Sequence, residues 1–256
     1  MDPATIIGVV LAFAAIFGSM ILEGGNPMAI FLVPPLILVF FGTIGAGIAG
    51  GLLSDAKAAG AALMRAFTGK APSPDDVVAA IVRLAEQARR EGLLALETGM
   101  REVDDAFLRD GLQGAIDGTD PEELAEILHG RIDTKRQADK QTAKFYADMG
   151  GYAPTIGIIG TVIGLVHVLE NLSQPEKLGH LIAGAFVATL WGVLSANVLW
   201  LPIASRLKRL SEVECHQMEL VVEGIMAIQS GTSPRVVAQK LRSMLPPQAQ
   251  AQAEAA

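Results

Sequence analysis

Hydroxyl side chains lie inside two long apolar segments of the chain, residues 150–168 and 181–205. Thr155 and Thr161 belong to the first segment, and Thr189 and Ser195 belong to the second. If both segments are helices, Thr161 and Thr189 lie at one depth, about 12–14 Å from the polar stretch that joins them. Oxygen atoms are the ligands that hard cations prefer. A threonine in a membrane helix can also bond only to a carbonyl of its own helix, which is the ordinary alternative.

A dense patch of mixed charge occupies a second stretch that could bind a partner. Its members are Glu86, Arg89, Arg90, Glu91 and Glu97. Such a patch is usually a solvated helix face with pairs three and four residues apart. The alternative is a docking face, on which complementary charge would set the orientation of a partner and its rate of association.

Prolines mark the same apolar segments. Pro154 lies near the start of 150–168 and Pro202 near the end of 181–205, where each removes a backbone donor and frees a carbonyl. Both could permit bending, or they could simply mark helix ends. Pro34 and Pro35 lie inside a further apolar segment, residues 27–53, and predict a break or bend within it.

The apolar segments contain no Asp, Glu, Lys or Arg in their interiors. Because ion transfer through lipid normally needs a titratable or anionic group, any ion path here needs a carboxylate from another chain. His167 is a possible exception, although it reads better as an interfacial residue. The sequence has no phosphate loop, nucleophile elbow, HExxH motif or catalytic carboxylate pair, so it predicts neither an enzyme nor a catalytic residue.

Composition points to a membrane protein. Only 18% of the 256 residues are charged, against about 25% in soluble domains. The single cysteine, Cys215, excludes an internal disulfide framework and a CxxC metal site, and we expect no bound metal or tight cofactor. A net charge of -7 argues against nucleic acid as a partner.

Four segments are long enough to cross a bilayer of about 30 Å as helices. They are residues 3–22, 27–53, 150–168 and 181–205. We therefore predict an all-α membrane protein with four transmembrane helices, a large helical cytoplasmic loop between the second and third, and a helical cytoplasmic C-terminal segment. The predicted domains are 1–53, 54–149, 150–205, 206–245 and a disordered tail, 246–256.

Orientation follows from lysine and arginine. Thirteen of these residues lie between Lys57 and Lys144, six follow Ser205, and only Lys177 lies between the last two segments. The positive-inside rule then places residues 54–149 and both termini in the cytoplasm of a bacterium, with the chain in its inner membrane.

The predicted loop contains two helix-start signals. Ser73-Pro74-Asp75-Asp76 is the first, and Thr119-Asp120-Pro121-Glu122-Glu123 is the second. The second helix continues through a polar stretch into 150–168. Gly92 is predicted to interrupt the first helix, and residues 206–227 form a helix with an apolar stripe.

Three segments together resemble the A subunits of flagellar stators, MotA and PomA, within the MotA/TolQ/ExbB superfamily. They are Ala88-Arg89-Arg90-Glu91-Gly92-Leu93-Leu94-Ala95-Leu96-Glu97, then Gly151-Tyr152-Ala153-Pro154-Thr155-Ile156-Gly157-Ile158-Ile159-Gly160-Thr161, then Ala185-Phe186-Val187-Ala188-Thr189-Leu190-Trp191-Gly192. The resemblance covers essentially the whole chain.

The resemblance implies a homo-oligomeric ring, a pentamer, around a B subunit that carries a membrane Asp and a peptidoglycan-binding domain. Ion flow past that Asp would turn the ring, which would drive the rotor protein FliG. In this chain the resemblance assigns rotor contacts to Arg89, Arg90 and Glu97, conformational roles to Pro154 and Pro202, and the ion path to Thr161 and Thr189, with Thr155 as a further candidate.

Ion choice is predicted to favour sodium over protons, because sodium-driven members of the family tend to have Thr where this chain has Thr161.

Three alternative functions remain open. A proton-driven energiser of the ExbB/TolQ type would usually have three spans. A non-conducting membrane scaffold would not need hydroxyls at matched depth. A self-contained channel would need its own acid or polar filter.

Overall fold

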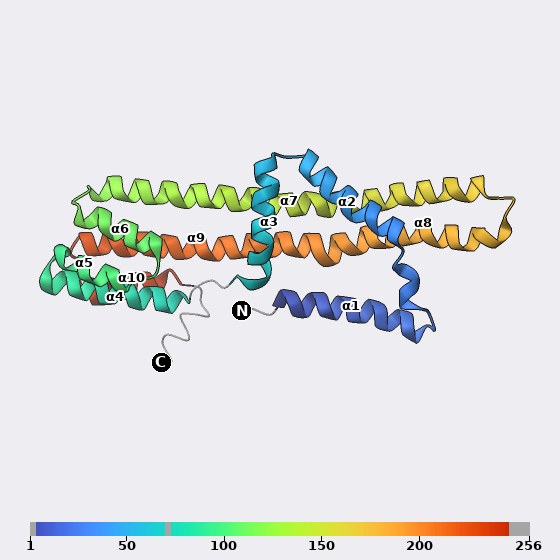
Figure 1. Ribbon diagram of the computed structural model, residues 1–256. Coiled ribbons are helices and arrows are strands. Elements are labelled where there is room, and N and C mark those ends of the chain that lie inside the picture. Colours follow the sequence, from blue (N-terminus) through green and yellow to red (C-terminus); the bar gives the residue numbers. More distant parts are fainter. Residues whose placement is uncertain (1–3, 70–72, 246–256) are drawn as a thin grey trace. The chain divides into compact units, whose positions relative to one another are not determined.

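The structure is a computed structural model that describes residues 4–69 and 73–245 (Figure 1). Every regular element in these ranges is a helix, which confirms the all-α prediction. The predicted tail 246–256 lies outside the described residues. The chain forms two compact units: the first comprises Met1–Lys70 and Asp139–Leu210, and the second comprises Ala71–Ala138 and Ser211–Ala256. The predicted domain 54–149 therefore contributes to both units.

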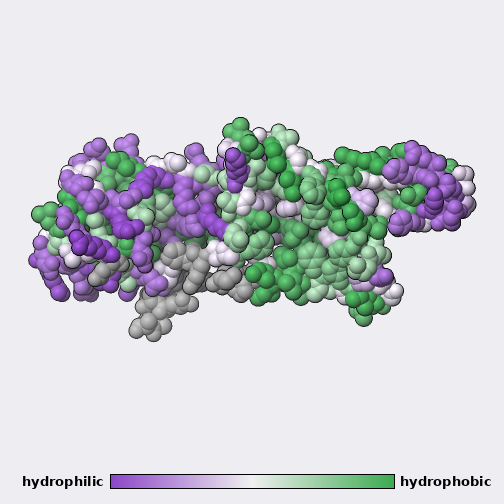
Figure 2. Space-filling model, viewed as in Figure 1, coloured by the Kyte–Doolittle hydropathy of each residue, from purple (hydrophilic) through white to green (hydrophobic). Residues whose placement is uncertain are grey.

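The first unit contains the apolar helices. Three helices of the described residues are long and apolar enough to cross a membrane, with windows in Thr5–Leu22, Pro121–Glu170 and Pro175–Gln229. The elements that carry them are α1 (Ala4–Leu22), α7 (Pro121–Glu170), α8 (Pro175–Ser195) and α9 (Leu201–Gln229). Figure 2 shows hydrophobic residues gathered over α1 and α2 and a hydrophilic turn joining α7 to α8.

The predicted second span, 27–53, is divided in the structure. A 3-10 helix, Pro27–Ile30, precedes α2 (Val33–Ala49), and α3 (Leu53–Thr68) begins after a short break. α2 has 17 residues, or about 25 Å, so it is shorter than the other three. The break predicted within this segment is present, because the helix is interrupted between Ile30 and Val33, directly before Pro34 and Pro35. These prolines lie in the first turn of α2, where the missing N–H groups would have no helical partner in any case.

Two polar contacts attach α3 to α7 within the first unit. Arg65 Nη1 lies 2.9 Å from Asp139 Oδ1 in a partly buried ion pair. The buried Tyr146 hydroxyl donates to the carbonyl of Ala59 at 2.8 Å. Alanines on α3, Ala59 and Ala66, are buried against the same cluster, which lets the helix approach α7 closely.

The second unit contains the two predicted helix starts. α4 (Pro74–Glu91) follows Ser73, although the Ser73 side chain makes no capping hydrogen bond. α4 ends at Gly92, whose φ of 86° is a conformation that favours glycine. α7 begins at Pro121, and the Asp120 carboxylate accepts from the N–H groups of Glu122 and Glu123. The helix then continues without interruption to Glu170, as predicted.

Short helices complete the second unit around one apolar core. They are a 3-10 turn at Leu93–Ala95, α5 (Leu96–Gly99), a 3-10 turn at Met100–Glu102, α6 (Ala106–Ile116) and α10 (Pro234–Ser243). Ile81 of α4, Leu128 of α7 and Ile225 of α9 are among the most buried side chains. Ile225 lies in the helix 206–227, for which an apolar stripe is predicted, so helical periodicity located this core position.

Candidate functional site

Glycine and alanine allow α7 and α8 to approach each other closely. A Cβ atom added at Gly157 would lie 2.8 Å from the Ala188 carbonyl oxygen and 3.2 Å from Gly192 Cα. Additions at Gly160 and Gly164 would lie 2.6 Å from the Cβ atoms of Ala188 and Ala185. These contacts fix the axial register of the two antiparallel helices, because no larger side chain fits between them.

Thr161 and Thr189 meet at this crossing. Their Oγ1 atoms are in direct hydrogen-bonding contact, and both are partly buried. Thr161 Oγ1 also lies 3.0 Å from the Ala185 carbonyl and 3.3 Å from the Gly157 carbonyl, while Thr189 Oγ1 lies 3.3 Å from the same Gly157 carbonyl. The structure thus gathers four oxygen atoms, two hydroxyl and two carbonyl, between two apolar helices. We call this group the oxygen cluster.

Thr155 is not part of the oxygen cluster. It lies six residues before Thr161 on α7, or about 9 Å along the helix axis. Its side chain is exposed, and its hydroxyl donates to the Tyr152 carbonyl of its own helix at 2.7 Å. Ser195 likewise bonds within its helix, to Gly192. The structure therefore separates the threonine pair from the other hydroxyls of these segments.

Pro154 and Pro202 lie inside helices and do not mark helix ends. Pro154 is an interior residue of α7. Pro202 is the second residue of α9, directly after a π-helical turn, Ala196–Trp200, that follows α8 without a break. The π-helical turn before Pro202 is wider than an α-helical turn. It therefore reduces the clash between the proline ring and the backbone carbonyl one turn earlier. Sequence reasoning did not predict this turn.

The two prolines flank one helix–helix contact. A Cβ atom added at Gly150, four residues before Pro154, would meet the side chain of Leu201 at 2.6 Å. Leu201 directly precedes Pro202. Each proline removes one backbone hydrogen bond, Pro154 from α7 and Pro202 from α9. Both losses lie within about one turn of the contact between Gly150 and Leu201.

The charged residues Arg89, Arg90 and Glu97 lie around the sharp turn at Gly92 in the second unit. Arg89 and Arg90 occupy the last turn of α4, and Glu97 lies in α5. Gln87 Nε2 donates to the Ala95 carbonyl at 2.9 Å, and the Leu96 side chain is completely buried. These two contacts hold the turn against the rest of the second unit. We call the exposed side chains Arg89, Arg90, Glu91, Leu94 and Glu97 the turn patch.

The turn patch is not a set of internal ion pairs. Within the part of the chain that the structure describes, none of Arg89, Arg90 and Glu97 forms a salt bridge, and all three side chains are exposed. Leu94 at its centre is 72% exposed. Pairs three and four residues apart, which the solvated-face interpretation predicts, are thus missing from these three residues. These three charges are therefore available to pair with complementary charges of another chain.

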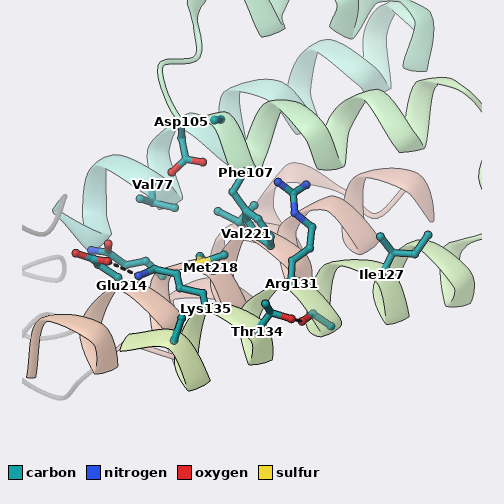
Figure 3. A pocket seen from close by; sticks show the side chains of 14 residues that line it. Val77, Asp105, Phe107, Ile127, Arg131, Thr134, Lys135, Glu214, Met218 and Val221 are labelled. Atoms are coloured by element: carbon teal, nitrogen blue, oxygen red, sulfur yellow. Dashed lines mark hydrogen bonds and ion pairs between the residues drawn. The ribbon is translucent and has the colours of Figure 1, made fainter. Parts of the chain in front are cut away.

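A pocket of about 930 Å³ opens between α7 and α9 in the second unit (Figure 3). Its basic residues already have acidic partners. Lys135 lies 2.8 Å from Glu214, and Arg131 lies 2.8 Å from Asp110 and covers the ring of Phe107. Within the described residues, no group of three or more His, Cys, Asp or Glu side chains is arranged to hold a metal. The basic side chains of the pocket are therefore already paired, and the carboxylate of Asp105, which also lines it, accepts from the Leu108 N–H at 2.8 Å.

Comparisons with known proteins match nearly the whole chain. Residues 6–92 match the family model described as motility protein A N-terminal, and residues 100–220 match that of the MotA/TolQ/ExbB proton channel family. Motility protein A of Bacillus subtilis is 36% identical over 247 residues, which cover 96% of this chain and 92% of that protein. Chemotaxis protein PomA of Vibrio alginolyticus is 33% identical, with 96% of each chain covered.

Two solved structures are similar along nearly their full length. The structure of C. jejuni MotAB matches with a TM-score of 0.92 at 31% identity, covering 96% of this chain and 97% of that chain. The flagellar MotAB stator complex from Bacillus subtilis matches with a TM-score of 0.90 at 34% identity, covering 97% and 98%.

Proposed function

This chain belongs to the MotA/TolQ/ExbB proton channel family, among its motility protein A members, and we propose that it is the A subunit of a flagellar stator. Since the matched family is one of proton channels and its motility protein A members are subunits of the flagellar motor, the chain is not an enzyme. With a B subunit, it would couple inward ion flow to torque on the rotor. The oxygen cluster between α7 and α8 is the observation on which this proposal rests.

The apolar segments supply oxygen but no acid. Residues 150–168 and 181–205 contain hydroxyls at the crossing of α7 and α8 and no Asp or Glu. A cation that leaves water must exchange its hydration shell for other oxygens and needs a compensating negative charge. We therefore infer that the B subunit contributes a membrane Asp opposite Thr161 and Thr189, and that its periplasmic part binds peptidoglycan.

Sodium is the ion that the oxygen cluster suits better. Thr161 Oγ1 lies within hydrogen-bonding range of the Thr189 hydroxyl and of the Gly157 and Ala185 carbonyls, and Thr189 Oγ1 also reaches the Gly157 carbonyl. A hard cation uses such oxygens as ligands, whereas a proton relay requires groups that accept and release a proton. We propose that sodium is the transported ion and that it is cargo, not a resident cofactor.

Torque transfer is assigned to the turn patch. We propose that Arg89, Arg90 and Glu97 contact the rotor protein FliG and that Pro154 and Pro202 let α7 and α9 bend as the ion passes. The assembly is a homo-oligomeric ring, a pentamer, in the bacterial inner membrane. α2 is the fourth span, and both termini and the second unit lie in the cytoplasm, in keeping with the distribution of lysine and arginine.

Co-expression in a strain without stators tests this function. The chain and the B subunit of the same organism would be expressed together and separately, and swimming would be recorded at several external sodium concentrations and fixed pH. We expect motility only with both chains, at a speed that rises with sodium. Motility with the chain alone, or none with both chains present in the membrane, would overturn the proposal. Speed that follows pH and ignores sodium would remove only the choice of ion.

A further inference from the structure

A cavity of about 430 Å³ opens between the start of α2 and the ends of α7 and α8 that lie near their connecting turn. Its walls are mainly apolar, with Leu32 and Pro34 from the α2 side and Gly160 from α7. Two histidines line the same cavity, His167 from α7 and His180 from α8. All of these residues belong to the first unit.

The helix register places the two histidines at nearly the same level along α7 and α8. Along α7, Gly157, Gly160 and Gly164 meet Gly192, Ala188 and Ala185 of α8 in turn, so each step forward is matched by a step of similar length backward. One more step from Gly164 reaches His167. The matching step from Ala185 reaches residues 181–182, beside His180. Both imidazoles are therefore attached at nearly the same level along the helix pair, and both line the same cavity.

Neither imidazole is used by the fold. Both side chains are exposed, and neither ring nitrogen has a hydrogen-bond or ion-pair partner among the described residues. The backbone carbonyl of His167 accepts from the Asn171 side chain at 2.8 Å, which leaves the ring uninvolved. Imidazole nitrogen is the commonest protein ligand of zinc and similar cations. Two such ligands on separate helices can be joined by one ion, with water completing its coordination.

We propose that His167 and His180 form a two-histidine site for a first-row divalent cation such as Zn²⁺, and that the bound cation clamps α7 to α8. The site lies six residues, or about 9 Å of helix, from Thr161. A clamp at this position would restrain the helices that carry the oxygen cluster. Zinc binding itself does not depend on the stator function; only its consequence for torque rests on the proposed function.

Zinc titration of the purified complex of the chain with its B subunit tests the site directly. Thermal unfolding would be followed at increasing Zn²⁺ for the wild type and for His167→Gln and His180→Gln. Because a ligand that binds only the folded state raises its midpoint, we expect an upward shift with zinc in the wild type. Each variant should unfold at the wild-type temperature without zinc, since both side chains are exposed, and should lose the zinc shift.

His129→Gln is the matched control, because His129 is an exposed histidine on the same helix α7. It should keep the full zinc shift. A wild type that shows no shift, or a shift that survives in both His167→Gln and His180→Gln, would overturn the site and return the two residues to ordinary interfacial histidines. Zinc-dependent slowing of swimming is a separate measurement, so failure of the stator function would leave the binding result intact.

Discussion

Thr161 of α7 and Thr189 of α8 share a hydrogen bond across the helix crossing, and both hydroxyls also reach the carbonyl of Gly157. The relationship depends on Gly157, because a side chain there would press on the backbone of α8. Two hydroxyls that face each other between apolar helices join the helices and also place oxygen ligands where an ion could pass.

Thr161→Ala should weaken sodium-dependent swimming and leave the complex assembled. The change removes one oxygen of the cluster, but interhelical hydrogen bonds in membranes contribute only about 0.6 kcal/mol on average, so folding should survive. The measurement is swimming speed against external sodium, with membrane abundance recorded in parallel. Thr161→Ser keeps the hydroxyl and should keep the sodium response. Thr155→Ala should have the smaller effect, because Thr155 bonds only within its own helix.

An unaltered sodium response in Thr161→Ala would contradict the role of the oxygen cluster. A loss of speed that is as large in Thr155→Ala as in Thr161→Ala would show that hydroxyls of α7 act without regard to the pairing across the crossing.

Gly192→Ala should disturb the oxygen cluster while leaving both threonines in place. The new methyl would lie 2.7 Å from the Ala153 carbonyl and 3.0 Å from Gly157 Cα, and backbone atoms cannot move aside cheaply. We expect a loss of stability of about 1–3 kcal/mol and a clear loss of swimming speed. Thermal unfolding of the purified complex and swimming assays measure the two effects.

Gly179→Ala is the control for this substitution, since a methyl at Gly179 of α8 would enter open space. It should swim normally. If both variants behave alike, the close approach of α7 and α8 does not govern the site.

Charge reversal in the turn patch should reduce torque more than it reduces membrane insertion. We expect Glu97→Arg, and Arg89→Glu combined with Arg90→Glu, to swim slowly at normal membrane abundance, because complementary charge orients a partner. The double change prevents either arginine from substituting for the other. Arg109→Glu, an exposed arginine of α6 without an ion pair among the described residues, is the control and should have little effect. Normal swimming of the Arg89 and Arg90 double variant would make the patch ordinary solvated surface.

Alkaline pH should destabilise the attachment of α3 to α7. Burial raises the pKa of the Tyr146 phenol from 10.0 to about 12. Because the unfolded chain loses this proton first, the contribution of Tyr146 is complete below pH 10 and is lost as pH rises towards 12. Its size is on the order of 2 kcal/mol.

Tyr146→Phe tests this assignment through unfolding measured from neutral to alkaline pH. It should cost about 1 kcal/mol at neutral pH, from the lost hydrogen bond to the Ala59 carbonyl, and should flatten the alkaline decline. Tyr152→Phe, which leaves Tyr146 in place, should retain the decline. An equal alkaline decline in Tyr146→Phe would assign the effect to another group.

Local signals predicted the parts of the fold that local chemistry determines. Asp120 and Pro121 began α7 where expected, and Gly92 ended α4. The matched depth of Thr161 and Thr189 was predictable because one short turn joins their helices and residue counts convert directly to distance.

Other features depend on contacts that the sequence does not encode locally. Arg65 and Asp139 are 74 residues apart, and no spacing pattern links them. Pro34 and Pro35 indicated the break within residues 27–53, but the apolar residues on both sides gave no signal for the start of α2 at Val33. The π-helical turn before Pro202 had no signal apart from the proline itself.

The central claim is that this chain provides the oxygen cluster and a second chain provides the acid. Sodium uptake into membrane vesicles, prepared from a strain without stators, measures this most directly. Three preparations are compared: vesicles with the chain alone, vesicles with the chain and its B subunit, and vesicles with the chain and a B subunit whose membrane Asp is changed to Asn. We predict uptake only with the intact B subunit. Uptake through the chain alone, or undiminished uptake with the Asn variant, would contradict the account.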